Sequence, residues 1–139
     1  MKKLIYAIIV LILFGFAIGY YLFNKPHKDY SIAQIELSIS AHDIFKAYNE
    51  DELRANQLYQ DKVIAVSGIV SGIDLNQKKA TIIYLESDDP LFGIQFTMLP
   101  SDSSQYLKLK KGDKTTLKGL CVGFTNDVVF TNATVVVKD

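Results

Sequence analysis

The sequence predicts an all-β domain, a five-stranded barrel with added helices, preceded by one transmembrane helix. The first observation is an uncharged run over residues 4–23, in which 18 of 20 residues are apolar. The second is the helical spacing of apolar side chains over residues 41–59. The third is a succession of β-branched runs and turns from residue 62 onward. With 139 residues, the chain is long enough for one domain.

The first expected element is a membrane-spanning helix over residues 4–23. Twenty helical residues extend about 30 Å, which is the thickness of the hydrocarbon core of a bilayer. Lys2 and Lys3 precede the run and favour a cytoplasmic N-terminus, with the domain outside the cell membrane. The alternative is a cleaved signal peptide ending at Ala17-Ile18-Gly19, which would leave a secreted or periplasmic protein. Apolar residues continue beyond that site and favour the uncleaved, single-pass anchor.

The zero net charge of the chain is a cancellation between two oppositely charged parts. Residues 1–28 carry four lysines and no acidic residue. Residues 29–139 carry 11 basic and 15 acidic side chains, a net charge of −4. We expect residues 1–28 to form the anchor or signal segment, residues 29–39 a linker, and residues 40–139 the folded domain.

A helical region follows the linker. Residues 34–40 alternate between apolar and polar side chains, which indicates a short strand or an extended lead-in. Ser40 then has the position of a helix N-cap, and Asp43 completes a capping box with it. The apolar spacing predicts one helix over residues 41–59, or two helices with a break near residues 49–51.

Five β-rich runs and a second, short helix make up the rest of the domain. Glycines at positions 68 and 72 predict bends in the first strand. The short helix is expected to begin at Ser101 or Asp102, between the third and fourth strands. The order of helix, three strands, short helix and two strands is that of the OB-fold, a Greek-key barrel. The expected strands cover residues 63–73, 80–86, 92–98, 115–124 and 128–138.

Alternation in the third strand places Phe92, Ile94, Phe96 and Met98 on one face. We interpret this stripe as core rather than as a platform for stacked bases. The single cysteine, Cys121, has no partner for an internal disulfide and is interpreted as a small buried hydrophobe.

Several spaced motifs resemble a known family. On the basis of these motifs, residues 39–137 or thereabouts resemble the tRNA_anti-like family of OB-fold proteins. The resemblance implies a nucleic-acid-binding ancestry, and members similar to this chain are often exported or membrane-attached bacterial proteins. It implies no catalytic motif. The motifs are Ile39-Ser40-Ala41-x-x-Ile44, Tyr48, Asn49-Glu50, Ala55, Tyr59-x-x-Lys62, Val66-x-Gly68-x-Val70, Leu107-x-x-x-x-Gly112-x-x-x-x-Leu117-x-Gly119-x-Cys121-x-Gly123 and Val128-x-Phe130-x-Asn132-Ala133.

The charge of the domain disfavours nucleic-acid binding, which we keep as the alternative function. Affinity for a phosphate backbone needs clustered lysine and arginine, and this domain is acidic with a single arginine, Arg54. Lys78 and Lys79, between the first and second strands, are the one basic pair at a position where OB-folds commonly bind ligands. An extracytoplasmic location would also keep the domain away from most nucleic acid.

Enzyme activity has no support in the sequence. His27 and His42 are isolated, and a metal site needs at least three ligands within reach. No nucleophile elbow, zinc-protease or phosphate-loop spacing occurs. We therefore expect no catalytic residue, no metal and no cofactor.

The remaining class is a membrane-anchored binding module of the cell envelope, with a protein, peptide or oligosaccharide as its ligand. OB-folds bind such ligands through one sheet face and the adjoining loops. Candidate ligand-binding residues are Tyr84 on the second strand, Phe124 beside the last hairpin, Asn126 within that hairpin, and Lys78 and Lys79.

Overall fold

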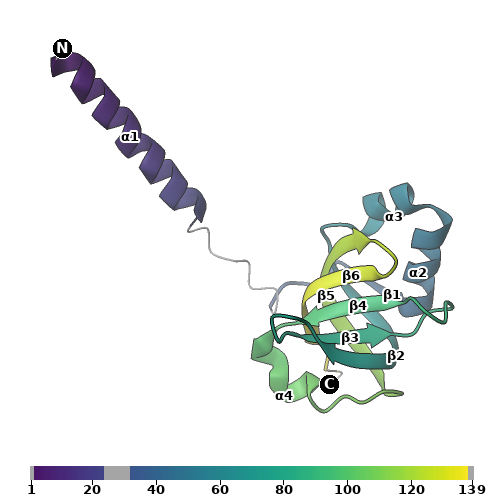
Figure 1. The fold of residues 1–139 in the computed structure, drawn as a ribbon. Helices are drawn as coiled ribbons and strands as arrows, with labels where there is room; N and C mark the ends of the chain where they lie inside the picture. The colour runs from purple at the N-terminus through teal and green to yellow at the C-terminus, as the bar shows by residue number, and fades with distance from the viewer. Residues whose placement is uncertain (1, 24–31, 138–139) are drawn as a thin grey trace.

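A computed structural model of the chain describes residues 2–23 and 32–137, without the side chains at positions 2, 4, 5 and 7. The ribbon is shown in Figure 1. In chain order its elements are α1 (Lys2–Phe23), β1 (Leu37–Ser40), α2 (Ala41–Glu50), α3 (Glu52–Tyr59), β2 (Val63–Leu75), β3 (Thr81–Leu85), β4 (Ile94–Met98), η1 (Pro100–Asp102), α4 (Ser103–Tyr106), β5 (Lys114–Phe124) and β6 (Val128–Val135).

The N-terminal helix α1 has 22 residues and contains the apolar run of residues 4–23. Within the part of the chain that the structure describes, no helix is long and apolar enough to cross a membrane. The transmembrane role of this segment therefore stays a prediction. Residues 24–31, which include the start of the predicted linker, and residue 138, the predicted end of the last strand, lie outside the described residues.

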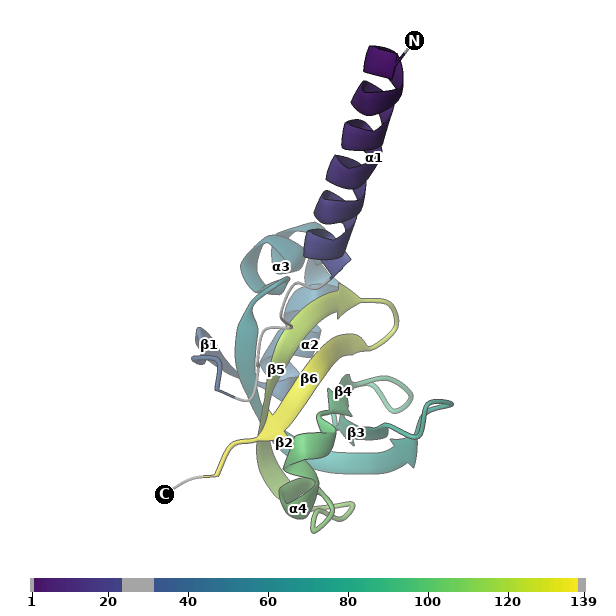
Figure 2. The same ribbon diagram turned by 90° about the vertical axis from the view of Figure 1, so that its left-hand side faces the viewer.

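Strands β2 to β6 close into a five-stranded barrel, because β5 pairs with β2 as well as with β6. The order around the barrel is β2-β3-β4-β6-β5. Every neighbouring pair is antiparallel except β4 and β6, which are parallel. Helices α2 and α3 lie at one end of the barrel and α4 at the opposite end (Figures 1 and 2). This is the Greek-key barrel of the OB-fold, and the predicted fold class is confirmed.

Strand β2 bends so that its two halves pair with different strands. Its first half pairs with β5 from Val63 to Ile69, and its second half pairs with β3 from Val70 to Leu75. The register with β3 shifts between Val70 and Gly72, where the glycine pattern predicted a bend. β1 adds a parallel strand on the other edge of the first half. This strand decides between the two interpretations of residues 34–40, and residues 37–39 of it belong to the segment expected to be linker.

The predicted helical region consists of two helices with a break at Asp51. The Ser40 side chain accepts a hydrogen bond from the backbone N–H of Asp43 at 3.1 Å, as its N-cap position predicted. Asp51 caps α3 in the same way, accepting from the N–H of Arg54 at 3.0 Å. The second cap starts a new helix direction, so the two-helix alternative is the one that the structure confirms.

The core of the barrel includes most of the predicted aromatic stripe. Ile94, Phe96 and Met98 are buried, and the ring of Phe96 stacks on that of Phe130 with centroids 4.5 Å apart. Phe92 differs from the prediction, because it lies before β4 and is 38% exposed. The strand begins only after Gly93, where the backbone passes so close to the carbonyl oxygen of Leu85 that a side chain would not fit.

Cys121 is fully buried beside Tyr48 of α2, in agreement with its interpretation as a small core residue. The Tyr48 Oη and Cys121 Sγ atoms are 3.5 Å apart. Burial raises the pKa of the Cys121 thiol, and it raises the pKa of the Tyr48 phenol strongly. Both groups are therefore held neutral in the folded protein at pH values where the unfolded chain ionises them.

We expect the barrel to lose stability as the pH rises above 9.0, the ordinary pKa of the thiol. Above that pH the unfolded chain releases a proton that the folded chain keeps, so the free energy of unfolding falls. The slope is up to about 1.4 kcal/mol per pH unit for each group. Urea unfolding of the wild type and Cys121→Ala between pH about 7.5 and about 10 would measure it. The variant should show a flatter fall, and equal slopes would contradict the assignment.

Candidate ligand-binding site

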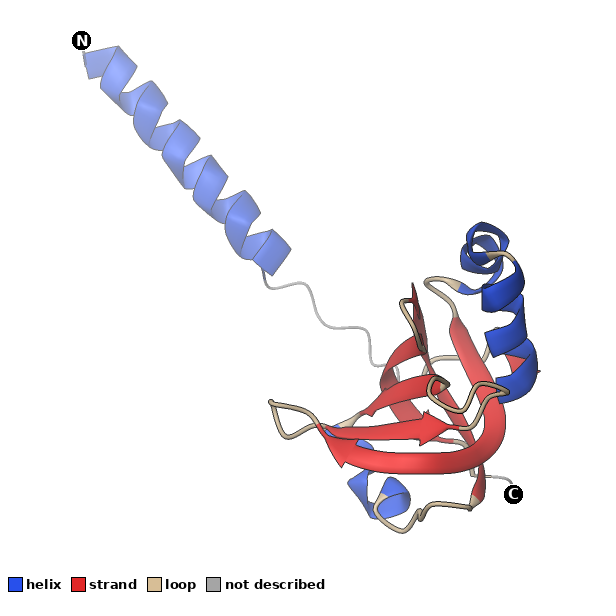
Figure 3. Cartoon of the chain, turned by 45° about the vertical axis from the view of Figure 1, so that its right-hand side comes forward, coloured by secondary structure: helices blue, strands red, loops and turns tan. Residues whose placement is uncertain are grey.

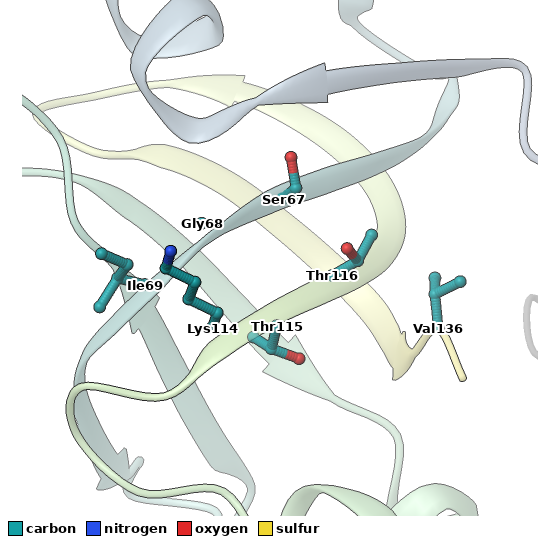
Figure 4. Close-up of a pocket in the computed structure, with 7 residues that line it drawn as sticks. All are labelled: Ser67, Gly68, Ile69, Lys114, Thr115, Thr116 and Val136. Atoms are coloured by element: carbon teal, nitrogen blue, oxygen red, sulfur yellow. The ribbon is translucent and has the colours of Figure 1, made fainter. Parts of the chain in front are cut away.

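The grooves on the described part of the barrel include two of about 500 Å³, large enough to hold part of a ligand. The first, of about 500 Å³, lies at the seam where β2 pairs with β5. Figure 4 shows Ser67 of β2 across from Thr116 of β5, with Lys114 beside Ile69. Its polar groups are hydroxyls and one exposed lysine on regular strands, and it contains no aromatic ring. This groove offers little that would select one ligand over another.

The second groove, which we call the Tyr84 pocket, has a volume of about 520 Å³. It lies where the bend in β2 and the end of β3 meet three loops: the loop after β3, the loop before β5 and the turn between β5 and β6. OB-folds commonly bind ligands on their second and third strands, here β3 and β4, and on the loops that correspond to the β2–β3 and β5–β6 turns. The pocket shares β3 and the β5–β6 turn with that surface. Its walls are formed by Ser71, Gly72, Tyr84, Leu85, Glu86, Ser87, Asp89, Pro90, Leu91, Phe92, Gly93, Lys111 and Asp127.

Tyr84 forms the aromatic wall of this pocket. In the strand register it lies between Gly72 of β2 and Gln95 of β4. Its neighbours in sequence, Ile83 and Leu85, are fully buried, so strand alternation turns the ring to the outer face. The pKa of the Tyr84 phenol is raised, mainly because the group is partly buried and to a smaller extent because of the negative charges of Asp127 and Asp74. The hydroxyl, which is protonated at neutral pH in any tyrosine, therefore remains a hydrogen-bond donor to higher pH than usual.

The loop between β3 and β4 presents two large apolar side chains at the pocket. Asp89 Oδ1 accepts hydrogen bonds from the backbone N–H groups of Leu91, at 2.7 Å, and Phe92, at 3.0 Å. The Ser87 hydroxyl accepts from the N–H of Asp89 at 3.0 Å and donates to the carbonyl oxygen of Phe92. These bonds hold the loop in one shape, although Leu91 is 82% exposed.

The same loop is attached to neighbouring elements at both sides. His42 Nδ1 of α2 is 2.7 Å from Asp88 Oδ2, and Figure 3 shows the loop beside the start of this helix. On the other side, Asp127 Oδ1 accepts a hydrogen bond of 2.7 Å from the N–H of Gly93. The N–H of Val128 in turn donates to the carbonyl oxygen of Gly93 at 3.0 Å. The apolar tip of the loop is thus positioned by contacts with α2 and with the β5–β6 turn.

The charges that line the Tyr84 pocket are mostly negative. Glu86, Asp89 and Asp127 face one lysine, Lys111, which reaches the pocket from the loop before β5. That loop is held in place by two backbone hydrogen bonds to Val70. The pocket therefore combines an aromatic ring, an apolar rim and an excess of carboxylates.

The candidate ligand residues from the sequence do not lie together. Tyr84 lines the pocket, and Asn126 is exposed in the turn next to Asp127. Lys78 and Lys79 are exposed in the turn at the opposite end of β3, about 17 Å away along five strand residues. Phe124 stacks on Tyr48 with ring centroids 5.4 Å apart and lies under α2. The ligand-binding role of these residues stays a prediction.

Sequence reasoning missed most of the pocket. Leu91 was assigned to no element, and Phe92 was assigned to the core by extending the alternation of β4. Nothing in the local sequence pattern singles out Glu86, Lys111 or Asp127 as residues of one site. The available signal was the segment Ser87-Asp88-Asp89-Pro90, whose turn residues precede two large apolar residues and a glycine.

Among the described residues, no group of three histidine, cysteine, aspartate or glutamate side chains is placed to hold a metal ion. The pocket can bind through hydrogen bonds, aromatic contact and charge. The expectation that the protein has no enzyme activity stays a prediction.

Comparisons with known proteins agree on the fold. The model of the tRNA_anti-like family matches residues 1–135. No curated protein matches the chain. A proposed nucleic acid-binding lipoprotein from Klebsiella pneumoniae is similar in structure, with a TM-score of 0.61 and 16% sequence identity, covering 81% of this chain and 100% of that one. Yeast Stn1 and Ten1 give a TM-score of 0.44 at 16% identity, covering 77% and 65%. At this identity the likeness to the Klebsiella protein shows the fold alone.

Proposed function

The chain belongs to the tRNA_anti-like family of OB-fold proteins, and from this premise we propose that it is a non-enzymatic binding module of the cell envelope. In this proposal α1 anchors the protein in the membrane, and the barrel binds a protein, peptide or oligosaccharide outside the cytoplasm. The observation that carries the proposal is the Tyr84 pocket, which places an aromatic ring on β3, one of the strands that OB-folds use for ligands, with an apolar rim from the neighbouring β3–β4 loop.

Membrane attachment is supported by the character of the N-terminal helix. The run of residues 4–23 is uncharged and follows two lysines. Its large apolar side chains for which exposure is known, from Tyr6 to Phe23, are between 46% and 95% exposed. Apolar side chains on all sides of a helix suit a lipid environment better than water.

Nucleic acid is the second candidate ligand. It is favoured by the family name and by the similar Klebsiella lipoprotein, which is itself proposed to bind nucleic acid. The lining of the Tyr84 pocket disfavours nucleic acid, because it contains three carboxylates and one lysine. Single-strand binding needs a positively charged groove to neutralise phosphates. A pocket with this charge repels a phosphate backbone, so we rank nucleic acid second.

A binding titration tests the choice of ligand. We expect the full chain, in nonionic detergent, to show no micromolar affinity for a fluorescent single-stranded DNA or RNA of about 15 nucleotides at low salt. Fluorescence anisotropy measures this directly. Micromolar binding that weakens steeply as salt is added would reverse the ranking of the two candidates.

A separate experiment tests the anchor. We expect the full chain to stay in the membrane fraction after carbonate extraction and to be digested by protease added outside intact cells. A soluble mature form would show instead that the N-terminal segment is cleaved. A domain protected from external protease would contradict the proposed orientation.

A further inference from the structure

The rim of the Tyr84 pocket exposes apolar surface in a fixed position. Phe92 and Leu91 are 38% and 82% exposed, although Asp89 holds the backbone N–H of each. Pro90 lies between this aspartate and the two apolar residues and stiffens the same loop. Leu91 is hardly buried in the free protein, and Phe92 still exposes part of its ring to water. Their burial becomes favourable when a partner covers them.

The electrostatics of the pocket complement a cation. Glu86 and Asp89 are exposed at its edge, and Asp127 lies on the opposite side, in the β5–β6 turn. Asp74, on the neighbouring strand β2, adds to the negative charge that acts on Tyr84. Lys111 is the one cation of the lining, so the balance is negative.

We propose that the Tyr84 pocket docks a cationic segment of a partner protein, a short stretch in which arginine or lysine alternates with aliphatic or aromatic side chains. The inference rests on the proposed function and specifies its ligand. The cationic side chains would meet Glu86, Asp89 and Asp127, and the apolar ones would pack against Leu91 and Phe92.

Charge and shape together favour this peptide over the other ligands considered. A phosphate backbone carries the same sign of charge as the pocket. A neutral oligosaccharide would use the Tyr84 ring but has no need for an excess of carboxylates. Arginine matches both features, since its guanidinium pairs with carboxylates and stacks on aromatic rings. A pocket of about 520 Å³ has the size of a small-ligand site, which a few peptide side chains would fill.

The test uses the full chain in nonionic detergent and a fluorescein-labelled heptapeptide of alternating arginine and leucine. The comparison probe is the same peptide with glutamate in place of arginine. We expect the arginine peptide to bind at least tenfold more tightly than the glutamate peptide, with an affinity that falls as salt is added.

Variants locate the binding. Glu86→Gln and Phe92→Ala should each weaken the arginine peptide about tenfold. Two controls lie outside the pocket, Glu52→Gln at the start of α3 and Leu107→Ala after α4. Both side chains are exposed, and we expect them to leave the affinity unchanged. Equal effects of pocket and control variants would mean that the peptide binds elsewhere and would overturn the inference.

A third probe, a hexasaccharide of N-acetylglucosamine, separates this inference from the proposed function. If the hexasaccharide binds and Phe92→Ala weakens it, while the arginine peptide does not bind, the inference fails and the binding module stands. If only the single-stranded oligonucleotide binds, both the peptide inference and the proposed function fail. Peptide binding that depends on Glu86 and Phe92 supports both.

Discussion

Replacing Phe130 by alanine is expected to lower the free energy of unfolding by about 4 kcal/mol, the largest effect that we predict for a single side chain. The Phe130 ring is fully buried and stacks on Phe96 with an interplanar angle of 11°. It belongs to β6, which pairs with β4 on one side and with β5 on the other. Removing the ring leaves a cavity among three strands that cannot all move inward.

Urea unfolding of the full chain in nonionic detergent, followed by circular dichroism, measures this loss. Leu107→Ala is the matched control, because it removes a large apolar side chain that is 71% exposed. We expect this control to change the stability by about 0.5 kcal/mol or less. A Phe130→Ala variant as stable as Leu107→Ala would show that the two rings are not the centre of the core.

The second large effect is expected for Gly93→Ala, at about 3 kcal/mol of lost stability. A Cβ atom at this position would lie 2.4 Å from the carbonyl oxygen of Leu85. The atom in conflict is backbone, so no side-chain rotation relieves the clash. The strands would have to separate at the pair of Leu85 with Ile94, where β4 begins.

Gly93→Ala should also damage the Tyr84 pocket, because Gly93 connects it to the rest of the barrel. Its N–H donates to Asp127, and its carbonyl oxygen accepts from Val128. We expect the variant to bind the arginine peptide at least tenfold more weakly than the wild type at a temperature where both remain folded.

Gly72→Ala is the control for this variant, since it lies in the same pocket. There the added Cβ would meet the Tyr84 ring at 3.8 Å, an ordinary van der Waals contact. We expect its stability to stay within about 1 kcal/mol of the wild type. A larger loss for Gly72→Ala than for Gly93→Ala would contradict the close backbone approach at Gly93.

Local patterns in the sequence predicted a large part of the fold. The caps at Ser40 and Asp51 depend on backbone groups three residues away, so the helix start and the region of the break could be inferred from short spacings. The burial of Ile94, Phe96 and Met98 follows from the two-residue period of a strand. The order of strands and helices then indicated the OB-fold, which the pairing confirms.

The same local rules produced the error at Phe92. Alternation alone placed Phe92 on the same buried face as Ile94, because periodicity carries no information about where a strand begins or ends. The strand stops at the close contact between Gly93 and Leu85, residues that belong to different strands. Phe124 shows the same limit, since its neighbours Phe45 and Tyr48 are far away in sequence.

The sequence by itself determined the apolar N-terminal segment, the acidic domain, the capped helices and the succession of strands, because each depends on composition or on neighbours within a few residues. Only the tertiary structure decided the composition of the Tyr84 pocket. Closure of the barrel brings the loop after β3, Lys111 and Asp127 to one place from three separate parts of the chain. Their meeting depends on strand pairing over long sequence separations, which no short pattern encodes.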